Sequence, residues 1–289
     1  MLQSTNPMTQ YLVYDVFTDT PFGGNQLAVF PDATSLPEDK LQSIAAEFNF
    51  SEVTFVYPPR DPAHTARVRI FTPTSEVDFA GHPTIGTLIA LFDLGASSPM
   101  VLELGVGPIK GEVTEEGAAF TAMQGLDILA HPDPALTADA LGLPQSAIVT
   151  ETHAPILASM GLPFVLVELD SRASLSACCP DMAAIRKGAE LHPASHDFAI
   201  FAYVRDGELI ESRMFAPLDN IPEDPATGSA SATLAALLTQ VFGAAQSLSF
   251  TQGVDMGRRS YIKAETTQDP LTVTIKGQAV RMMSGQFII

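Results

Sequence analysis

The chain has 289 residues, of which 46% are hydrophobic and 17% charged, a composition typical of a compact globular protein. Its 15 basic and 33 acidic residues give a formal net charge of −18, which argues against a nucleic-acid partner because phosphate binding requires a basic surface. We expect a cytoplasmic protein with no membrane partner, because the sequence shows no signal peptide, no apolar run approaching ~18 residues and only two, adjacent cysteines.

The first half predicts short strands around one apolar helix. A strand at 11–17 is followed by a turn rich in Gly and Pro. Ser35 is the expected N-cap of a helix that ends near Asn49, because Glu38 stands three residues after it. A second helix, at 84–94, is apolar. Further strands are expected at 26–30, 52–56, 67–71, 101–104, 111–114 and 118–123.

The second half repeats this order. Asp206-Gly207 predicts a hairpin between strands at 198–204 and 208–215. A second apolar helix, at 231–241, follows a turn of small residues. Short helices are expected at 138–141 and 182–188. The other strands are expected at 148–152, 164–169, 248–252, 260–265, 271–276 and 285–289.

One string, Arg-x-Phe-x-Pro, occurs twice, and its copies begin at Arg69 and Arg213, 144 residues apart. This period is too long for a solenoid and predicts two related lobes. We expect a first lobe at 1–124, joined by the C-terminal strand 278–289, and a second lobe at 125–277. Each copy precedes an acidic loop and a small-residue turn that opens the apolar helix. Two such helix starts facing one cleft would bind an anion.

Three side chains near these features are candidates for chemistry. Glu52 shares a strand face with Thr54, and the local sequence alone favours a solvated residue there. In an apolar cleft, a glutamate could instead carry a proton near neutral pH. His82 either caps or packs at its helix start, or donates to a substrate oxygen or shuttles a proton. Asp224 is either a helix cap or a site residue.

Other residues give weaker signals. Gly228 and Ser229 would hold a carboxylate at the second helix start. Asn25 is most often a turn residue and is a secondary candidate for the site. No His or Lys stands near Cys178 in the sequence, which disfavours a nucleophile there. No spacing of ligands predicts a metal, and no glycine-rich phosphate loop predicts a nucleotide.

At these residues the chain resembles the PhzF-like family of phenazine-biosynthesis isomerase relatives, which share the fold of diaminopimelate epimerase and proline racemase. The resemblance spans nearly the whole chain. It is carried by 15–17 with 24–25, 51–56, 69–73 through 80–83, 161–163 and 213–230. It implies an α+β fold of two pseudo-symmetric lobes, each a barrel-like mixed β-sheet wrapped around a central helix, with the site between the lobes.

The resemblance also implies roles for individual residues, no cofactor and a homodimer. Glu52 would be the acid/base, and His82 and Asp224 would bind and polarise the substrate. The substrate's carboxylate would be held by Gly81, Gly228 and Ser229. One departure is Gln26, which stands where a Pro commonly follows Gly-Asn.

Racemases of this fold place a cysteine at each of two helix starts, and neither helix start has a cysteine here. We therefore expect a cofactor-independent isomerase that moves a proton between carbons of a small carboxylate substrate in an interlobe cleft. The alternatives are a catalytically silent small-molecule-binding protein, an epimerase or racemase without the thiol pair, and an enzyme that depends on Cys178.

Overall fold

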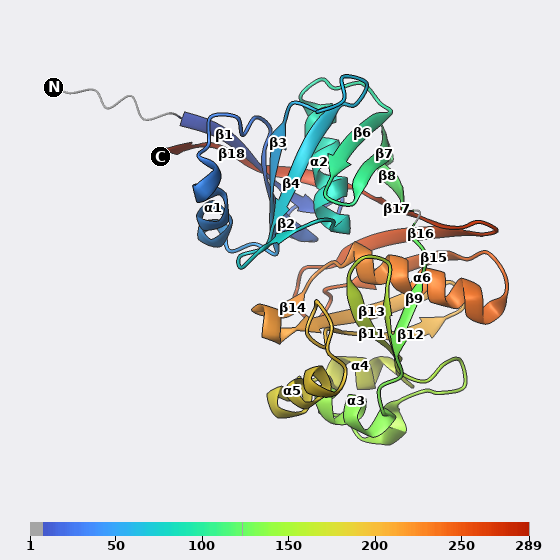
Figure 1. The fold of residues 1–289 in the computed structure, drawn as a ribbon. Coiled ribbons are helices and arrows are strands. Elements are labelled where there is room, and N and C mark those ends of the chain that lie inside the picture. The colour runs from blue at the N-terminus through green and yellow to red at the C-terminus, as the bar shows by residue number, and fades with distance from the viewer. Residues whose placement is uncertain (1–7, 123, 289) are drawn as a thin grey trace. The chain divides into compact units, whose positions relative to one another are not determined.

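The computed structural model describes residues 8–122 and 124–288, and the chain divides into two compact units (Figure 1). The first unit runs to Phe120 and takes up the chain again from Lys276, whereas the second spans Thr121–Ile275. The last strand, β18 (Ala279–Ile288), pairs antiparallel with the first, β1 (Met8–Val16). The C-terminal segment is therefore part of the first unit.

The first unit is a mixed sheet curled around the helix α2 (Gly81–Asp93). This helix packs against β1, β2, β3, β7 and β18, and its residues 81–90 are all buried. A helix that is apolar on every side is stable only when it is enclosed. The other strands and helices of this unit are β2 (Asn25–Phe30), a 3₁₀ turn (Glu38–Lys40), α1 (Leu41–Phe48), β3 (Glu52–Tyr57), β4 (Ala66–Phe71), β5 (Glu76–Val77), β6 (Met100–Leu104), β7 (Gly107–Thr114) and β8 (Gly117–Ala122).

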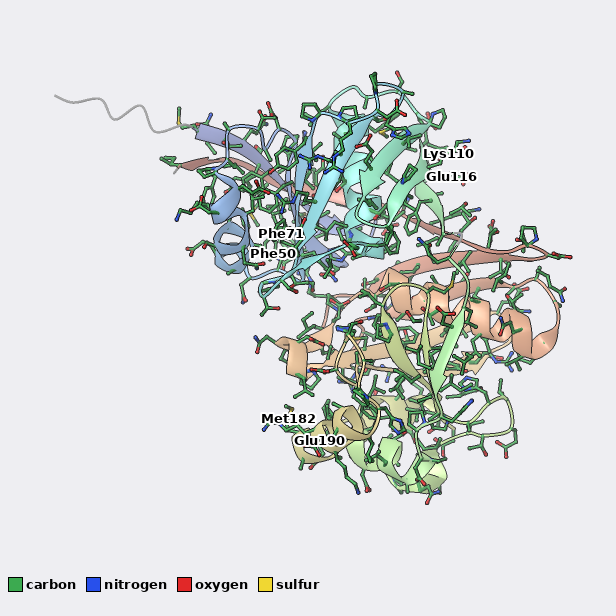
Figure 2. The ribbon with its side chains drawn as sticks, viewed as in Figure 1. Phe50, Phe71, Lys110, Glu116, Met182 and Glu190 are labelled. Atoms are coloured by element: carbon green, nitrogen blue, oxygen red, sulfur yellow. The ribbon has the colours of Figure 1, made fainter. Side chains whose placement is uncertain are left out.

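The outer face of this sheet carries a second apolar layer. Phe55 and Phe71 belong to a buried cluster that includes Leu41 and Ile44 of α1. Phe50 packs against the same cluster, and its ring lies 5.7 Å from that of Phe48 (Figure 2). Because α1 covers one face and α2 the other, both faces of the central strands are buried.

The second unit has the same plan, with its own enclosed helix, α6 (Gly228–Phe242), packed on β11 and β16. A buried apolar cluster joins its strands to three outer helices, α3 (Pro134–Leu141), α4 (Arg172–Ala177) and α5 (Met182–Leu191). Its strands are β9 (Asp127–Ala130), β10 (Ile156–Ser159), β11 (Pro163–Glu168), β12 (Ile200–Asp206), β13 (Leu209–Ala216), β14 (Ile221–Asp224), β15 (Ser247–Gln252), β16 (Ser260–Gln268) and β17 (Leu271–Gly277); two further 3₁₀ turns span Gln145–Ala147 and Pro217–Asp219.

Strand pairing shows that the two units are copies of one topology. In the first unit, β1–β2, β3–β4 and β6–β7 are antiparallel, and β2–β3 and β4–β6 are parallel. The second unit repeats this alternation with β10–β11, β12–β13 and β15–β16 antiparallel, and with β11–β12 and β13–β15 parallel. The predicted fold class, two pseudo-symmetric lobes of mixed sheet around a central helix, is confirmed.

Several predicted elements are wrong in detail. No strand forms at 148–152, where Ile148 makes only one bridge, to Leu169, and the strand of that region is β10. Ser35 does not cap a helix: its Oγ lies 2.7 Å from Thr9 Oγ1, and the 3₁₀ turn before α1 starts after Pro37. The prediction missed α4, β9, β10 and β14, and both central helices begin three residues earlier than expected, at Gly81 and Gly228. Met123 and Ile289, each at the end of a predicted strand, lie outside the described residues.

No helix within residues 8–122 and 124–288 has the length and apolar character needed to cross a membrane.

Candidate active site

Glu52 is the first residue of β3, and it is enclosed rather than solvated. Thr54, on the same strand face, is fully buried, and its Oγ1 accepts a hydrogen bond of 3.0 Å from Thr87 Oγ1 of α2. The side chain of Glu52 is only 14% exposed. The local pattern suggested a solvated position because it could not show that α2 covers the face opposite Val53 and Phe55.

His82, the second residue of α2, meets Glu52 directly. Its Nδ1 lies 2.9 Å from Glu52 Oε2, and its side chain is 4% exposed. The distance suits an ion pair, but Glu52 Oε2 makes no hydrogen bond of good geometry within the described part of the chain, although it is shielded from water. A buried carboxylate oxygen without an aligned donor is costly for stability and is chemically available to accept a proton.

Neither His82 nor Asp224 is the N-cap residue of its helix, the role that the sequence left open. The N-cap of α2 is Ala80 and that of α6 is Thr227, and the side chain of neither N-cap residue makes a capping hydrogen bond. The first backbone N–H groups of a helix have no acceptor within the helix, which is why helix starts commonly bind anions.

Asn25 begins β2, which runs parallel to β3, and it is 2% exposed. Its Oδ1 accepts a 3.3 Å hydrogen bond from Ser51 Oγ, next to Glu52 in the chain. Gly24 precedes it at φ +60°, and a Cβ there would stand 2.2 Å from Val16 O, so only glycine fits. The structure thus brings Asn25, Glu52, Gly81 and His82 into one region of the first unit.

In the second unit, Asp224 ends β14 and is buried within a polar network. Its Oδ2 accepts a 2.6 Å hydrogen bond from Thr227 Oγ1. Gln252, fully buried on β15, donates from Nε2 to Asp224 O and Thr227 Oγ1 and accepts at Oε1 from Thr227 N. Gly228 and Ser229 follow as the first residues of α6. Sequence reasoning missed Thr227 and Gln252.

The duplicated scaffold carries different residues in its two copies. Phe71 pairs with Val53 and Phe215 pairs with Ile200, so Ala199 holds the position that Glu52 has in the first unit. Counting from the two helix starts, Ser229 corresponds to His82, and Asp224 corresponds to Val77. Aligning the β13–β15 register with that of β4–β6 makes Gln252 the counterpart of Leu104. Because this alignment depends on strand register, the sequence held no local signal for Gln252.

The two cysteines differ from each other in their exposure to solvent. Cys178 is buried, and burial raises the pKa of its thiol to about 12, so it is almost wholly protonated near neutral pH. Cys179 is exposed.

We expect iodoacetamide at pH 8 to label Cys179 but not Cys178 in the native protein, because the thiolate is the reacting form. Mass spectrometry of the labelled protein would show one adduct, and a second after unfolding. Catalytic activity should be unchanged by the single adduct; loss of activity in step with labelling would instead support an enzyme that depends on its cysteines.

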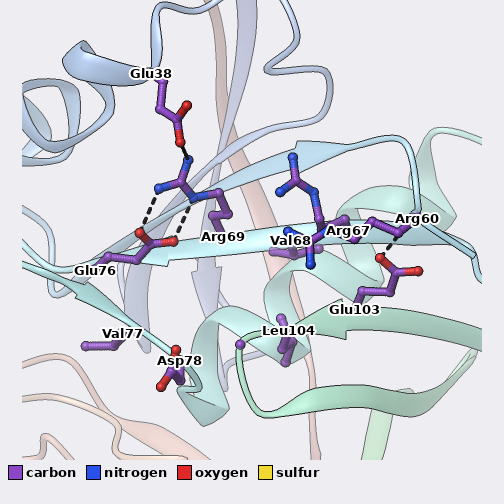
Figure 3. A pocket seen from close by; sticks show the side chains of 11 residues that line it. Glu38, Arg60, Arg67, Val68, Arg69, Glu76, Val77, Asp78, Glu103 and Leu104 are labelled. Carbon is purple, nitrogen blue, oxygen red and sulfur yellow. Dashed lines mark hydrogen bonds and ion pairs between the residues drawn. The ribbon is translucent and has the colours of Figure 1, made fainter.

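A surface pocket on the first unit holds many charges but is largely self-neutralised (Figure 3). Arg69 binds Glu76 and Glu38 there. Glu103 accepts hydrogen bonds from the backbone N–H groups of Asp61 and Arg60 and from His64. We therefore do not assign a ligand to this pocket.

We expect Glu103 to contribute to the free energy of unfolding in a way that depends on pH in the acidic range. Its hydrogen bonds from the Asp61 and Arg60 backbone, and then from His64, lower its pKa from the ordinary 4.5 to about 2. Because the pKa is lower in the folded state, the stabilisation is present above about pH 4.5 and is lost as the pH falls towards 2. Urea unfolding of Glu103→Gln should show a deficit against wild type at pH 7 that shrinks on acidification. The exposed Glu116→Gln is the control, and a deficit independent of pH would contradict this account.

Comparison with known proteins finds consistent matches over the full length. The family model described as phenazine biosynthesis-like protein (PhzC-PhzF) matches residues 14–285. A trans-2,3-dihydro-3-hydroxyanthranilate isomerase from Pseudomonas chlororaphis is 36% identical, over 98% of this chain and 100% of the relative. The crystal structure of a PhzF-family protein from Bacillus anthracis matches with a TM-score of 0.85 at 24% identity, over 98% of this chain and 100% of that one. A hydroxyproline epimerase from Agrobacterium vitis shares the fold, with a TM-score of 0.61 at 14% identity over 97% and 91% of the two chains.

Proposed function

Because the chain belongs to the phenazine biosynthesis-like (PhzC-PhzF) family and is an isomerase, we propose that Glu52 moves a proton between two carbons of a small unsaturated carboxylate without a cofactor. The observation that carries this proposal is the enclosed Glu52 carboxylate, whose Oε2 lies against His82 without an aligned hydrogen bond. A general base must be held close to the proton that it takes, and it must not already be fully hydrogen-bonded.

The proposed reaction conserves atoms and electrons. Glu52 takes a proton from one carbon, and the electron pair of the broken C–H bond moves into the conjugated system of the substrate. A second carbon then takes a proton from Glu52, either the original one or one exchanged with solvent, so the enzyme returns to its starting state. His82, whose Nδ1 lies 2.9 Å from Glu52 Oε2, polarises the substrate as its charge develops.

Substrate binding is the proposed task of Asn25, Gly81, Asp224, Gly228 and Ser229. The first N–H groups of α2 and α6 suit a carboxylate, because the helix dipole favours negative charge there. Asp224 is held rigidly by Thr227 and Gln252, which suits a group that must hold a polar substrate atom in one place. A homodimer remains part of the proposal.

A single carboxylate favours isomerisation over inversion. Inverting a carbon generally needs bases on opposite faces of the substrate, but the second unit has Ala199 where the first has Glu52, and Ser229 where the first has His82. The asymmetry supports one base that serves two carbons. The substrate of the Pseudomonas chlororaphis relative, trans-2,3-dihydro-3-hydroxyanthranilate, is a compound of this class and the first candidate to test.

The test is NMR of trans-2,3-dihydro-3-hydroxyanthranilate and a panel of small unsaturated amino and hydroxy acids, incubated with the protein in D₂O. The proposal expects a shifted double bond, with deuterium or the original proton at the new carbon. Deuterium only at the original carbon, with inversion, would indicate an epimerase. Ligand binding without exchange or rearrangement would indicate a catalytically silent binding protein.

A further inference from the structure

Arg213, the first residue of the second Arg-x-Phe-x-Pro motif, is bound at every nitrogen of its guanidinium. Nε and Nη2 each donate a 2.8 Å hydrogen bond to the two carboxylate oxygens of Glu223. Nη1 donates to three backbone carbonyls at 3.1–3.2 Å, those of Leu175, Ser176 and Cys178. The residue is 9% exposed, and its guanidinium also stacks 4.7 Å above the ring of Phe215.

Arg69 is the counterpart of Arg213 in the first unit. It binds a glutamate through the same pair of hydrogen bonds, from Nε and Nη2, which we call a fork. Its Nε and Nη2 donate 2.7 Å hydrogen bonds to both oxygens of Glu76. Glu76 and Glu223 are equivalent, since each lies five residues before the first residue of its central helix. The third nitrogen of Arg69 binds Glu38 instead of backbone carbonyls (Figure 3). The motif therefore contains a guanidinium clamp on the loop that leads into each central helix.

The two clamps differ in their surroundings. The partners of Arg69 are exposed, with Glu76 at 42% and Glu38 at 82%. The partner of Arg213 is 17% exposed, and three further bonds join Arg213 to the end of α4. Exposed ion pairs contribute little to structure, whereas a buried, fully hydrogen-bonded fork fixes geometry.

The residue after Glu223 is Asp224, the substrate-binding residue of the proposed function, on which this inference rests. Neighbouring side chains of a strand point to opposite faces, so the strand β14 that carries Glu223 on one side presents Asp224 on the other. We propose that Arg213 is a positioning residue: by gripping Glu223, it sets the orientation of Asp224 without touching the substrate. The equivalent position after Glu76 is Val77, so the clamp of the first unit orients no polar side chain.

Lysine cannot replace arginine in this role. The planar Arg213 guanidinium donates to five acceptor atoms, whereas a lysine ammonium has three donors around a single nitrogen and cannot bind a carboxylate in the same bidentate way. We expect Arg213→Lys to lower kcat by about 10- to 100-fold, the order of loss that misplacing a site group by ~1 Å causes. Arg69→Lys, the matched control, should leave kcat close to that of wild type.

The decisive experiment is a double-mutant cycle on kcat, using Arg213→Lys, Asp224→Asn and the double variant. If Arg213 acts through Asp224, Arg213→Lys should cause almost no further loss in the Asp224→Asn background. Two additive losses, or an Arg213→Lys variant as active as wild type, would overturn the inference. Thermal unfolding shows whether each variant is folded. If Arg213→Lys does not fold, Glu223→Gln takes its place in the cycle, because it weakens the same pair of hydrogen bonds from the glutamate side.

The Asp224→Asn variant separates this inference from the proposed function. Wild-type activity in Asp224→Asn would overturn the role of Asp224 and, with it, the positioning role of Arg213. A slow Asp224→Asn variant with an additive Arg213→Lys effect would keep the role of Asp224 and overturn only that of Arg213.

Discussion

Replacing Glu52 with glutamine is expected to lower kcat by about 10²- to 10⁴-fold, the usual contribution of a positioned acid/base. Glutamine keeps the size of the side chain but cannot take up a proton, so substrate binding should be retained. The measurements are kcat by steady-state kinetics and deuterium incorporation by NMR, with binding followed by calorimetry. Turnover and exchange should disappear together, because both require the same proton transfer.

The same substitution should not reduce stability. Glu52 Oε2 is buried without an aligned hydrogen bond, so a neutral amide in its place removes the cost of a poorly solvated charge. Glu116→Gln, an exposed change in the same unit, is the matched control and should match wild type in both rate and melting temperature. A Glu52→Gln enzyme with an unchanged rate would remove Glu52 from the mechanism.

Replacing Gly253 with alanine is expected to destabilise the second unit by about 3 kcal/mol or more, from the sum of left-handed strain and steric overlap. Gly253 has φ +71°, and a Cβ there would lie 2.4 Å from Arg258 O and 2.8 Å from Pro225 O. Both atoms are backbone, so the chain itself must move. Pro225 follows Asp224, and its carbonyl also accepts a 2.6 Å hydrogen bond from Ser260 Oγ, so activity should fall with stability.

Gly257 supplies the control for this prediction. It has the same φ of +71° in the same loop, but nothing lies within 4 Å of the position that its Cβ would take. Gly257→Ala should therefore show only the conformational strain, roughly 1–2 kcal/mol. Urea denaturation of both variants measures the difference. Equal losses would mean that the contacts at Gly253 relax freely and that the loop after Asp224 is not closely packed.

Much of the fold followed from local patterns in the sequence. The hairpin at Asp206-Gly207 and the two apolar helices were predicted because turn chemistry and helical apolar runs act over a few residues. The strand at 148–152 was wrong because Val and Thr there favour a strand, yet only one bridge, Ile148 to Leu169, provides a partner. A strand forms only when another strand is available to bond with it, and local sequence does not show that.

The candidate residues were found by sequence, but their surroundings were not. Glu52 was assigned to solvent on its local pattern, and only the packing of α2 against β3 shows that it is enclosed. Gln252 lies 28 residues beyond Asp224, and no local signal connects them. That the seven predicted site residues act together in one reaction is still a prediction.

The sequence by itself determined the duplication, the two enclosed helices and the motifs that place the chain in its family. Each of these features depends only on the order of the residues along the chain. Only the tertiary structure showed which groups the repeated arginines bind and which residues occupy equivalent positions in the two units. Arg213 reaches carbonyls more than 30 residues away, and Glu52 is set apart from Ala199 by strand register alone. Burial and hydrogen bonding depend on groups distant in the chain, so they emerge only when the chain is folded.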